Sequence, residues 1–378
     1  MVTATLRQQL RVRLWRPYQA VRRVLDARLF EHRFHRRPDA LTVESAWTAA
    51  SPTPDDAALV DRICKAYRLT ASAPASPGNS MWNEFFREHH LDLHEALLAE
   101  DRTTITRMLR DPASCDLFYG FENLCRFLLR GQRLEDRKAP QMTLDAMLAL
   151  AEAIGDQRCD NPEAYRLSAP KRTDPDRLLT RIESALGVNL PVPNPFPREF
   201  GLKTERGVIS YRVPQAIYQA WRLRTLTANI RDPRVVEIGP GLGRTAFYAR
   251  QLGIRDYTLV DVPISCVAQA YFLGRTLGSD TITLEGEAPK PGSISIVSPE
   301  SFLEAQSSYD VALNADSLTE LDQSVAAAYV GAMRERTKML LSMNHEANAF
   351  TVADIVGRAS YRFPCWLRRG YVEELFEF

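Results

Sequence analysis

The chain has 378 residues, a hydrophobic content of 45%, a charged content of 25% and a formal net charge of +1. This length allows two domains with a core each, and the balanced charge argues against a nucleic-acid partner. No apolar run approaches the roughly 20 residues that cross a bilayer, and the N-terminus lacks the apolar core of a secretory signal. The 6 scattered cysteines favour free thiols and, by default, the cytoplasm.

Residues 1–40 contain many more arginines than acidic residues. Pro17 can begin a helix in which Val21, Leu25 and Leu29 form an apolar face. A basic amphipathic helix can lie on an anionic membrane or dock on a partner. We favour an exposed arginine-rich face, and keep peripheral membrane association through this segment as the alternative.

Residues 41–52 are small and polar, which predicts a linker. From there to residue 195 the apolar spacing is helical, and no strand pattern precedes about residue 205. The expected helices include residues 58–67, 117–128, 142–154 and 178–186. A run of prolines from Pro191 to Pro197 predicts a boundary. We therefore expect an all-helical N-terminal domain over residues 1–195 and a second domain over residues 196–378.

The second domain is expected to begin with a short strand at residues 207–211 and a helix from Pro214, whose Tyr218 and Arg222 are candidate pocket residues. Further on, strands and helices alternate, and the expected elements are strands at 235–238, 257–260, 294–297, 310–313 and 339–343, helices at 267–277 and 325–336, and a late strand at 371–378. Repeated βα units predict a mostly parallel sheet with helices on both faces. A late strand returning at the sheet edge would be antiparallel.

A glycine turn follows the strand at residues 235–238 and contains Gly239, Gly241 and Gly243. A dinucleotide fingerprint would need its third glycine at position 244, which is Arg244. Glu237 would crowd a pyrophosphate, but it suits an ammonium group. Asp261, after the next strand, can accept two hydrogen bonds from a ribose diol. An adenosine joined to a zwitterionic amino acid fits both ends, and this predicts S-adenosylmethionine as the cofactor.

The later motifs carry a family resemblance over roughly residues 197–378. The segments involved are residues 237–243, 259–263, 271–273, 314–320 and 342–346. They resemble the bacterial sugar O-methyltransferases found among enzymes of surface-polysaccharide assembly and, more broadly, class I S-adenosylmethionine-dependent methyltransferases. The resemblance implies a Rossmann-like α/β fold. It also implies that the cofactor's methionine end lies on Glu237, Gly239, Gly241 and Gly243, with Asp261 at the ribose, Ser298 near the adenine and Asn314 near the sulfonium.

A sugar hydroxyl is a poor nucleophile at neutral pH, so a general base is expected at the carboxyl end of the sheet. His345 is the only histidine of the second domain and follows a strand. Asp316 and Glu320 are the competing candidates, and either could instead orient His345 or bind sugar hydroxyls. Asp316, Glu320 and Glu346 also offer oxygen ligands for a divalent cation, but their spacing specifies no metal. Helix capping by Asp316 is the structural alternative.

The leading hypothesis is therefore an O-methyltransferase of a sugar or a saccharide-linked precursor. The alternatives are an O-methyltransferase of a non-sugar small molecule, a catalytically inactive scaffold in a polysaccharide-assembly complex, and a nicotinamide-dependent enzyme, which Arg244 disfavours. The helical N-terminal half would cap the active site or build a homo-oligomer.

Overall fold

The computed structural model describes residues 33–36, 41–49, 54–70, 81–115, 117, 135–159 and 173–378. The basic segment expected over residues 1–40 and the helix expected over residues 117–128 therefore lie almost wholly outside the described residues. Within the described part, no helix is long and apolar enough to cross a membrane.

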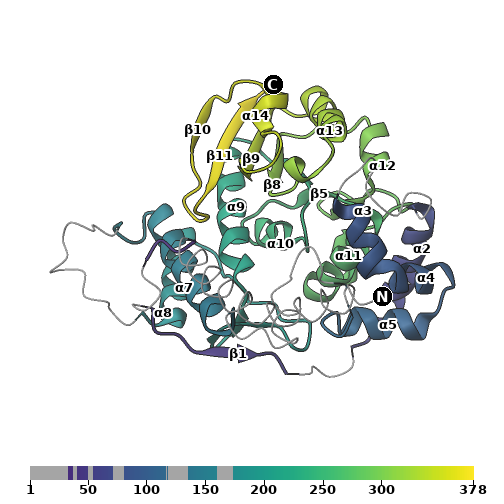
Figure 1. The fold of residues 1–378 in the computed structure, drawn as a ribbon, viewed down its shortest axis with the longest axis horizontal. Coiled ribbons are helices and arrows are strands. Elements are labelled where there is room, and N and C mark those ends of the chain that lie inside the picture. Colours follow the sequence, from purple (N-terminus) through teal and green to yellow (C-terminus); the bar gives the residue numbers. More distant parts are fainter. Residues whose placement is uncertain are drawn as a thin grey trace, which may run out of the picture.

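An eight-stranded sheet forms the centre of the fold, in the order β10-β11-β9-β8-β4-β5-β7-β6 (Figure 1). Its strands are β4 (Arg234–Ile238), β5 (Asp256–Val260), β6 (Ile282–Thr283), β7 (Ile294–Val297), β8 (Val311–Ala315), β9 (Met339–His345), β10 (Tyr361–Pro364) and β11 (Tyr371–Glu377). Neighbouring strands are parallel except at β11, which is antiparallel to both β9 and β10. The mostly parallel Rossmann-like α/β sheet is thus confirmed. The late strand is antiparallel as expected, but it is not at the edge, because β10 lies outside it.

Helices cover both faces of this sheet, as expected. Val235 and Leu259 enter the hydrophobic cluster that contains α9, α10 and α11, whereas Val236 and Val260 enter the cluster of α12, α13 and α14. Side chains alternate between the two faces of a strand, so a sheet buried on both sides needs apolar residues at consecutive positions. These helices are α9 (Arg212–Leu226), α10 (Arg244–Gln251), α11 (Pro263–Leu277), α12 (Pro299–Glu304), α13 (Gln323–Arg336) and α14 (Val352–Val356).

The chain order reverses around β4, which pairs with β5 on one side and with β8 on the other. In open α/β sheets the crevice at such a switch point, beyond the carboxyl ends of the strands, is where ligands bind. The glycine turn lies directly after β4, so the fold places it at this crevice.

A second, three-stranded sheet corrects the expectation of a linker over residues 41–52. Residues 45–47 form β1 (Ser45–Trp47), which pairs antiparallel with β2 (Phe200–Thr204), and β2 pairs with β3 (Gly207–Ile209). The N-terminal region is therefore not all-helical. A three-residue strand has almost no periodicity of its own, and its partner lies about 150 positions away in the chain, so local pattern could not reveal it.

The N-terminal helices and the sheet region contribute to one continuous hydrophobic cluster, so the described residues do not form two separate cores. The domain boundary at residue 195 stays a prediction. Buried Asp56, just before α2, accepts hydrogen bonds from Arg110 Nη2 at 2.6 Å and from the Tyr271 hydroxyl of α11 at 2.6 Å. α2 packs against α11, and Figure 1 shows α2 to α5 grouped on the α11 side of the molecule. The helices are α2 (Ala57–Thr70), α3 (Met81–Phe85), the π-helix η2 (Phe86–His90), α4 (Leu91–Leu98), α5 (Arg102–Arg110), α7 (Glu135–Ala153) and α8 (Pro175–Leu186).

Candidate active site

A cavity of about 310 Å³ lies at the carboxyl ends of β4, β5 and β8. It brings together six of the ten site residues expected from the sequence. These are Glu237, Gly239, Gly241, Asp261, Asp316 and Glu320. The other four, described below, lie outside its lining. We call the part around Glu237 and Asp261 the cofactor end, and the part around Asp316 and Glu320 the acceptor end.

Two glycines of the turn, Gly239 and Gly243, are required for different reasons. At Gly239 the backbone is left-handed, with φ at +67°, and an added Cβ would lie 2.2 Å from the Ser317 hydroxyl oxygen. This close approach joins the turn to the loop after β8. Gly243 does not line the cavity. It precedes α10 with φ at +81°, and an added Cβ would lie within 3.2 Å of Leu259 and Leu273 side chains. Its role is therefore to pack the helix closely on the sheet.

Glu237 is 2% exposed at the floor of the cofactor end and accepts a hydrogen bond from the Tyr257 hydroxyl at 2.8 Å. Burial raises the pKa of its carboxyl group to about 7, although the bond from Tyr257 opposes the rise. A cation entering the cavity would favour the ionised form. Glu237 can therefore receive an ammonium group, as the sequence predicts.

Asp261 is held by two donors, the Val262 backbone N–H at 2.8 Å and the side-chain amide of Gln269 at 2.9 Å. Burial raises the pKa of this carboxyl group to about 7 as well. The same Gln269 nitrogen donates to the Gly241 carbonyl at 2.9 Å, so one buried amide joins the glycine turn to Asp261. Sequence reasoning missed Gln269, and the signal that could have found it is a polar residue in the middle of the apolar helix α11.

Arg244, at the first position of α10, is buried and lines the cavity. Its Nη2 lies 3.7 Å from Glu199 Oε1, and its guanidinium lies 5.4 Å from the Phe272 ring centre. A helix N-terminus adds positive potential at this point. An acid, Glu237, and a cation thus flank the glycine turn, which suits the two charges of an amino-acid zwitterion. From the sequence, Arg244 is only evidence against a dinucleotide-binding site, and its place in the cavity is not predicted.

The acceptor end is organised around Asp316, whose φ of +60° is unusual for a residue other than glycine. Its carboxylate accepts hydrogen bonds from Arg368 Nη1 at 2.6 Å and the Tyr371 hydroxyl at 2.8 Å. Burial alone would raise the pKa of Asp316, but the charges of Arg368 and Arg212 outweigh it and lower the pKa. Asp316 is therefore a fixed anion and a weak base.

Glu320 ends a short 3₁₀ turn, η5 (Leu318–Glu320), on the other side of Asp316. Burial, reinforced by the negative charge of Asp316, raises the pKa of its carboxyl group to about 7. A group with such a pKa exchanges protons readily at neutral pH, which is what a general base requires.

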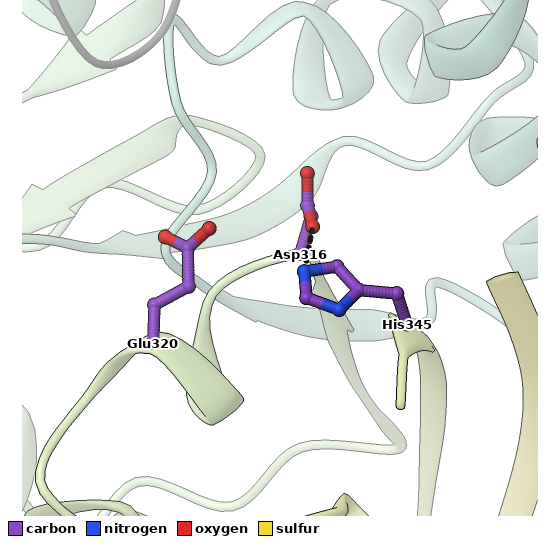
Figure 2. Close-up of side chains that lie close together, drawn as sticks. All are labelled: Asp316, Glu320 and His345. Carbon is purple, nitrogen blue, oxygen red and sulfur yellow. Dashed lines mark ion pairs between the residues drawn. The ribbon is translucent and has the colours of Figure 1, made fainter. Parts of the chain in front are cut away.

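His345 points toward Asp316, and Figure 2 shows the two side chains with Glu320 opposite. Its Nε2 lies 3.8 Å from Asp316 Oδ1, and its Nδ1 accepts the Ala347 backbone N–H at 3.2 Å. Because Nδ1 is the acceptor, the neutral ring carries its proton on Nε2. The nitrogen that faces the cluster is then a donor. This geometry favours Glu320 over His345 as the base.

One ligand atom each from Asp316, Glu320 and His345 can lie within 4.8 Å of one another, which is close enough to consider a metal ion. The third carboxylate considered from the sequence, Glu346, instead pairs with Arg362 at 2.7 Å. A cation here would compete with Arg368 for Asp316, so the arrangement favours an ion pair over a metal centre.

Asn314 requires a correction, because its fully buried side chain lies behind the cavity wall. Its Nδ2 donates to the Ile238 carbonyl at 3.0 Å and the Ser317 hydroxyl at 2.5 Å, and its Oδ1 accepts from Asn344 at 2.8 Å. These bonds join β8 to β4 and β9. The amide therefore holds the strand ends in register, and it does not line the cavity where a cofactor is expected.

Ser298 and the two candidate pocket residues of α9 also have structural partners. The Ser298 hydroxyl caps α12 by accepting the Ser301 N–H at 3.2 Å, and its own N–H donates to Glu285 at 2.9 Å. It borders a separate, smaller cavity. Tyr218 and Arg222 both bind the buried carboxylate of Glu373 in β11, at 2.6 and 2.7 Å, and so fasten α9 to the sheet.

No family model matches the chain, and no curated protein matches it. Among solved structures, the chain is similar to the magnesium protoporphyrin IX methyltransferase of Synechocystis PCC 6803 with bound S-adenosylhomocysteine, at 11% identity and a TM-score of 0.32, over 46% of this chain and 90% of that one. It is also similar to the methyltransferase domain of bacterial CtHen1, at 15% identity and a TM-score of 0.31, over 42% and 97%. A third is the ribosomal protein L11 methylase of Lactobacillus delbrueckii subsp. bulgaricus, at 10% identity and a TM-score of 0.32, over 43% and 79%. Scores this low identify no substrate.

Proposed function

We propose that the protein is an S-adenosylmethionine-dependent O-methyltransferase that acts on a sugar hydroxyl. The proposal rests mainly on one cavity whose two ends carry different chemical groups. Glu237, Arg244 and Asp261 offer an acid, a cation and a diol acceptor at one end, and Glu320 offers a carboxyl group with a pKa near 7 at the other.

The cofactor end fits S-adenosylmethionine by the chemistry of its donors and acceptors. Glu237 would hold the ammonium group, Arg244 and the start of α10 the carboxylate, and Asp261 the ribose diol. Gly239 leaves no room for a side chain beside Ser317, so the turn presents bare backbone to the ligand. When bound, the cofactor supplies a methyl group on a positively charged sulfur.

At the acceptor end, ionised Glu320 would take the proton of the acceptor hydroxyl while the cavity walls hold that oxygen in line with the methyl group. Proton removal by a positioned base contributes about 10²- to 10⁴-fold in rate. Asp316 stays ionised between Arg368 and Tyr371 and keeps the pKa of Glu320 raised by its charge. Asp316 is therefore a positioning residue and Glu320 the proton acceptor.

A sugar or saccharide-linked precursor is the acceptor class that we propose. Side chains that can donate or accept several hydrogen bonds gather on this part of the wall, and a sugar offers several hydroxyl groups to bind them, which an apolar acceptor does not. They are Arg212, Gln215, Gln219, Asp316 and Glu320. The resemblance to sugar O-methyltransferases supports the same class.

The first test is calorimetric titration of the purified protein with S-adenosylhomocysteine and, separately, with NAD. We expect micromolar binding of S-adenosylhomocysteine and none of NAD. Methyl transfer would then be measured from labelled S-adenosylmethionine to a panel of free, nucleotide-linked and lipid-linked sugars, with non-sugar alcohols and phenols alongside. If the folded protein does not bind S-adenosylhomocysteine, the catalytically inactive scaffold becomes the favoured interpretation. Turnover confined to phenols would retain the methyltransferase and overturn the sugar.

A further inference from the structure

Two aromatic side chains from the N-terminal helical region line the same cavity. Trp82 and Phe85 both belong to α3, and their ring centres are 5.6 Å apart in an edge-to-face arrangement. Each is only partly buried, whereas the next residue, Phe86, is buried. Large aromatic rings normally bury most of their surface. The partly exposed pair beside a polar cavity therefore suggests a surface that a ligand covers.

The backbone around these residues has an unusual form. α3 continues directly into the π-helix η2, which is followed by α4. Single π-turns within helices are rare and frequently occur at functional sites. Here the turn begins at Phe86, whose ring packs 5.3 Å from the His94 ring, toward the hydrophobic cluster. Trp82 packs in part against the same cluster, and Trp82 and Phe85 both line the cavity.

The contacts of this segment place it near the Asp261 end of the cavity. His94, beside Phe86, is hydrogen-bonded through Nδ1 to the Tyr67 hydroxyl at 2.7 Å. Tyr67 borders a small cavity together with Pro263 and Cys266, in the first turns of α11. α11 begins two residues after Asp261, so these successive contacts connect α3 to the start of α11 and indicate that α3 lies on the β5 side of the cavity.

The helices that support α3 are fastened closely to the sheet region. Gly274 of α11 faces Leu59 of α2, and a Cβ at Gly274 would lie 2.7 Å from the leucine side chain. Arg62 of α2 also binds Glu287 through Nε and Nη2, both at 2.7 Å. The position of the two rings is thus tied to the sheet that carries Asp261.

At this end of the cavity the other lining residues include Val262 and Tyr329. The Tyr329 hydroxyl lies close enough to Asp261 and Glu300 for their charges to raise its pKa in addition to burial. An apolar side chain, a tyrosine and the two rings of α3 form surroundings suited to a flat, weakly polar group next to a ribose. A purine base is such a group.

We propose that Trp82 and Phe85 form an aromatic wall that packs on the adenine base of the bound cofactor. The inference rests on the proposed function, because it assumes an adenosine ligand with its ribose at Asp261. It assigns cofactor affinity to a segment more than 150 residues before the glycine turn. It also gives the N-terminal helical region a direct part in the site.

The test is calorimetric titration of the full chain and of the variants Trp82→Ala and Phe85→Ala with two probes, S-adenosylhomocysteine and adenosine. Loss of one stacking partner should lower the affinity for both probes by a similar factor, roughly 10- to 100-fold. Trp47→Ala is the matched control, because Trp47 is 43% exposed in β1 and does not line the cavity. It should bind both probes like the unchanged protein.

Two results would overturn the wall while leaving the proposed function standing. One is binding within two-fold of the unchanged protein in both alanine variants, and the other is weaker S-adenosylhomocysteine binding with unchanged adenosine binding. No binding by the unchanged protein would instead remove the proposed function and the wall together. Should an alanine variant fail to fold, Trp82→Phe provides a second readout. S-adenosylhomocysteine should change the tryptophan fluorescence of the unchanged protein and not that of Trp82→Phe, and equal changes in both would overturn the wall.

Discussion

The two ends of the cavity are built from different parts of the chain. The cofactor end uses residues 237–269, which form a strand, a turn, a helix, a second strand and the start of a second helix in unbroken order. The acceptor end gathers Arg212 from α9, Asp316 and Glu320 after β8, and Arg368 and Tyr371 from the last hairpin. Apart from the proposed aromatic wall, the cofactor end is a local motif, whereas the acceptor end exists only after the whole sheet has formed.

The carboxyl groups of the two ends differ in a second way. Burial raises the pKa of both Glu237 and Asp261. At the acceptor end burial acts on Asp316 and Glu320 alike, yet their pKa values move in opposite directions, because Arg368 donates directly to Asp316 and not to Glu320. Burial acts on all four carboxyl groups, and the positions of Arg368 and Arg212 beside Asp316 separate the anion from the base.

Glu320→Gln should have the largest effect and tests the acceptor end. We expect the kcat for methyl transfer to fall by about 10²- to 10⁴-fold, because the variant cannot take the hydroxyl proton. Steady-state kinetics with the best acceptor would measure it, and affinity for S-adenosylhomocysteine should stay within two-fold. In the unchanged protein, kcat should rise with pH up to about 7 and then level off, since Glu320 must be ionised.

Asp322→Asn is the control for that variant. Asp322 lies two residues further on and caps α13 by accepting the Ser324 N–H at 2.9 Å, a role that asparagine can keep. The variant should retain full activity. If Glu320→Gln is as active as Asp322→Asn, Glu320 is not the base.

Asp261→Ala tests the cofactor end. Hydrogen bonds to a charged group contribute about 1.5–3 kcal/mol, so S-adenosylhomocysteine should bind roughly 10- to 150-fold more weakly. Calorimetry measures the change. Asp256→Ala removes a carboxylate from the other end of the same strand, where it lies 3.5 Å from Arg234, and should leave binding unchanged. Equal affinities for the two variants would contradict a ribose site at Asp261.

The pH dependence of binding tests the role of Glu237. Its pKa near 7 in the free protein means that, below pH 7, an ammonium ligand must displace a proton, whereas above pH 7 the carboxylate is already ionised. Glu237 alone should therefore weaken binding of S-adenosylhomocysteine by up to about ten-fold per pH unit below 7, and Asp261, whose pKa is also about 7, adds to this slope if the ribose prefers its ionised form. Titration in two buffers of different ionisation enthalpy should show proton release at pH 6.5. Glu237→Gln should reduce both effects, and a pH slope that survives this change unaltered would assign the linkage to other groups.

His345→Ala should have the smallest effect. Because Nδ1 accepts a backbone N–H and Nε2 faces Asp316 as a donor, the ring is not placed to receive a proton. We expect kcat to stay within about five-fold, or about 1 kcal/mol in the activation barrier. A loss comparable to that of Glu320→Gln would return His345 to the role of base.

The sheet class, most element positions and the placing of Glu237 and Asp261 beside the glycine turn could be predicted from the amino-acid sequence. These follow from local rules, since consecutive apolar residues form buried strands, helical spacing forms α9, α11 and α13, and glycines allow the turn after β4. Glu237, Asp261 and the glycines are close in sequence, so local pattern is enough to interpret their chemistry.

Which polar groups face the cavity, and which of them are ionised at neutral pH, depends on the tertiary structure and could not be predicted from the sequence. Asn314 and Asp316 are two positions apart, yet one is sealed between strands and the other lies in the acceptor end, because Asp316 adopts a left-handed backbone after β8. Trp82 lines the cavity although it lies more than 100 residues before the glycine turn, and β1 pairs with β2, which is also more than 100 residues away in the chain. Contacts at such separation depend on how elements pack, which local pattern does not encode, and the pKa values that distinguish Glu320 from Asp316 depend on the same packing.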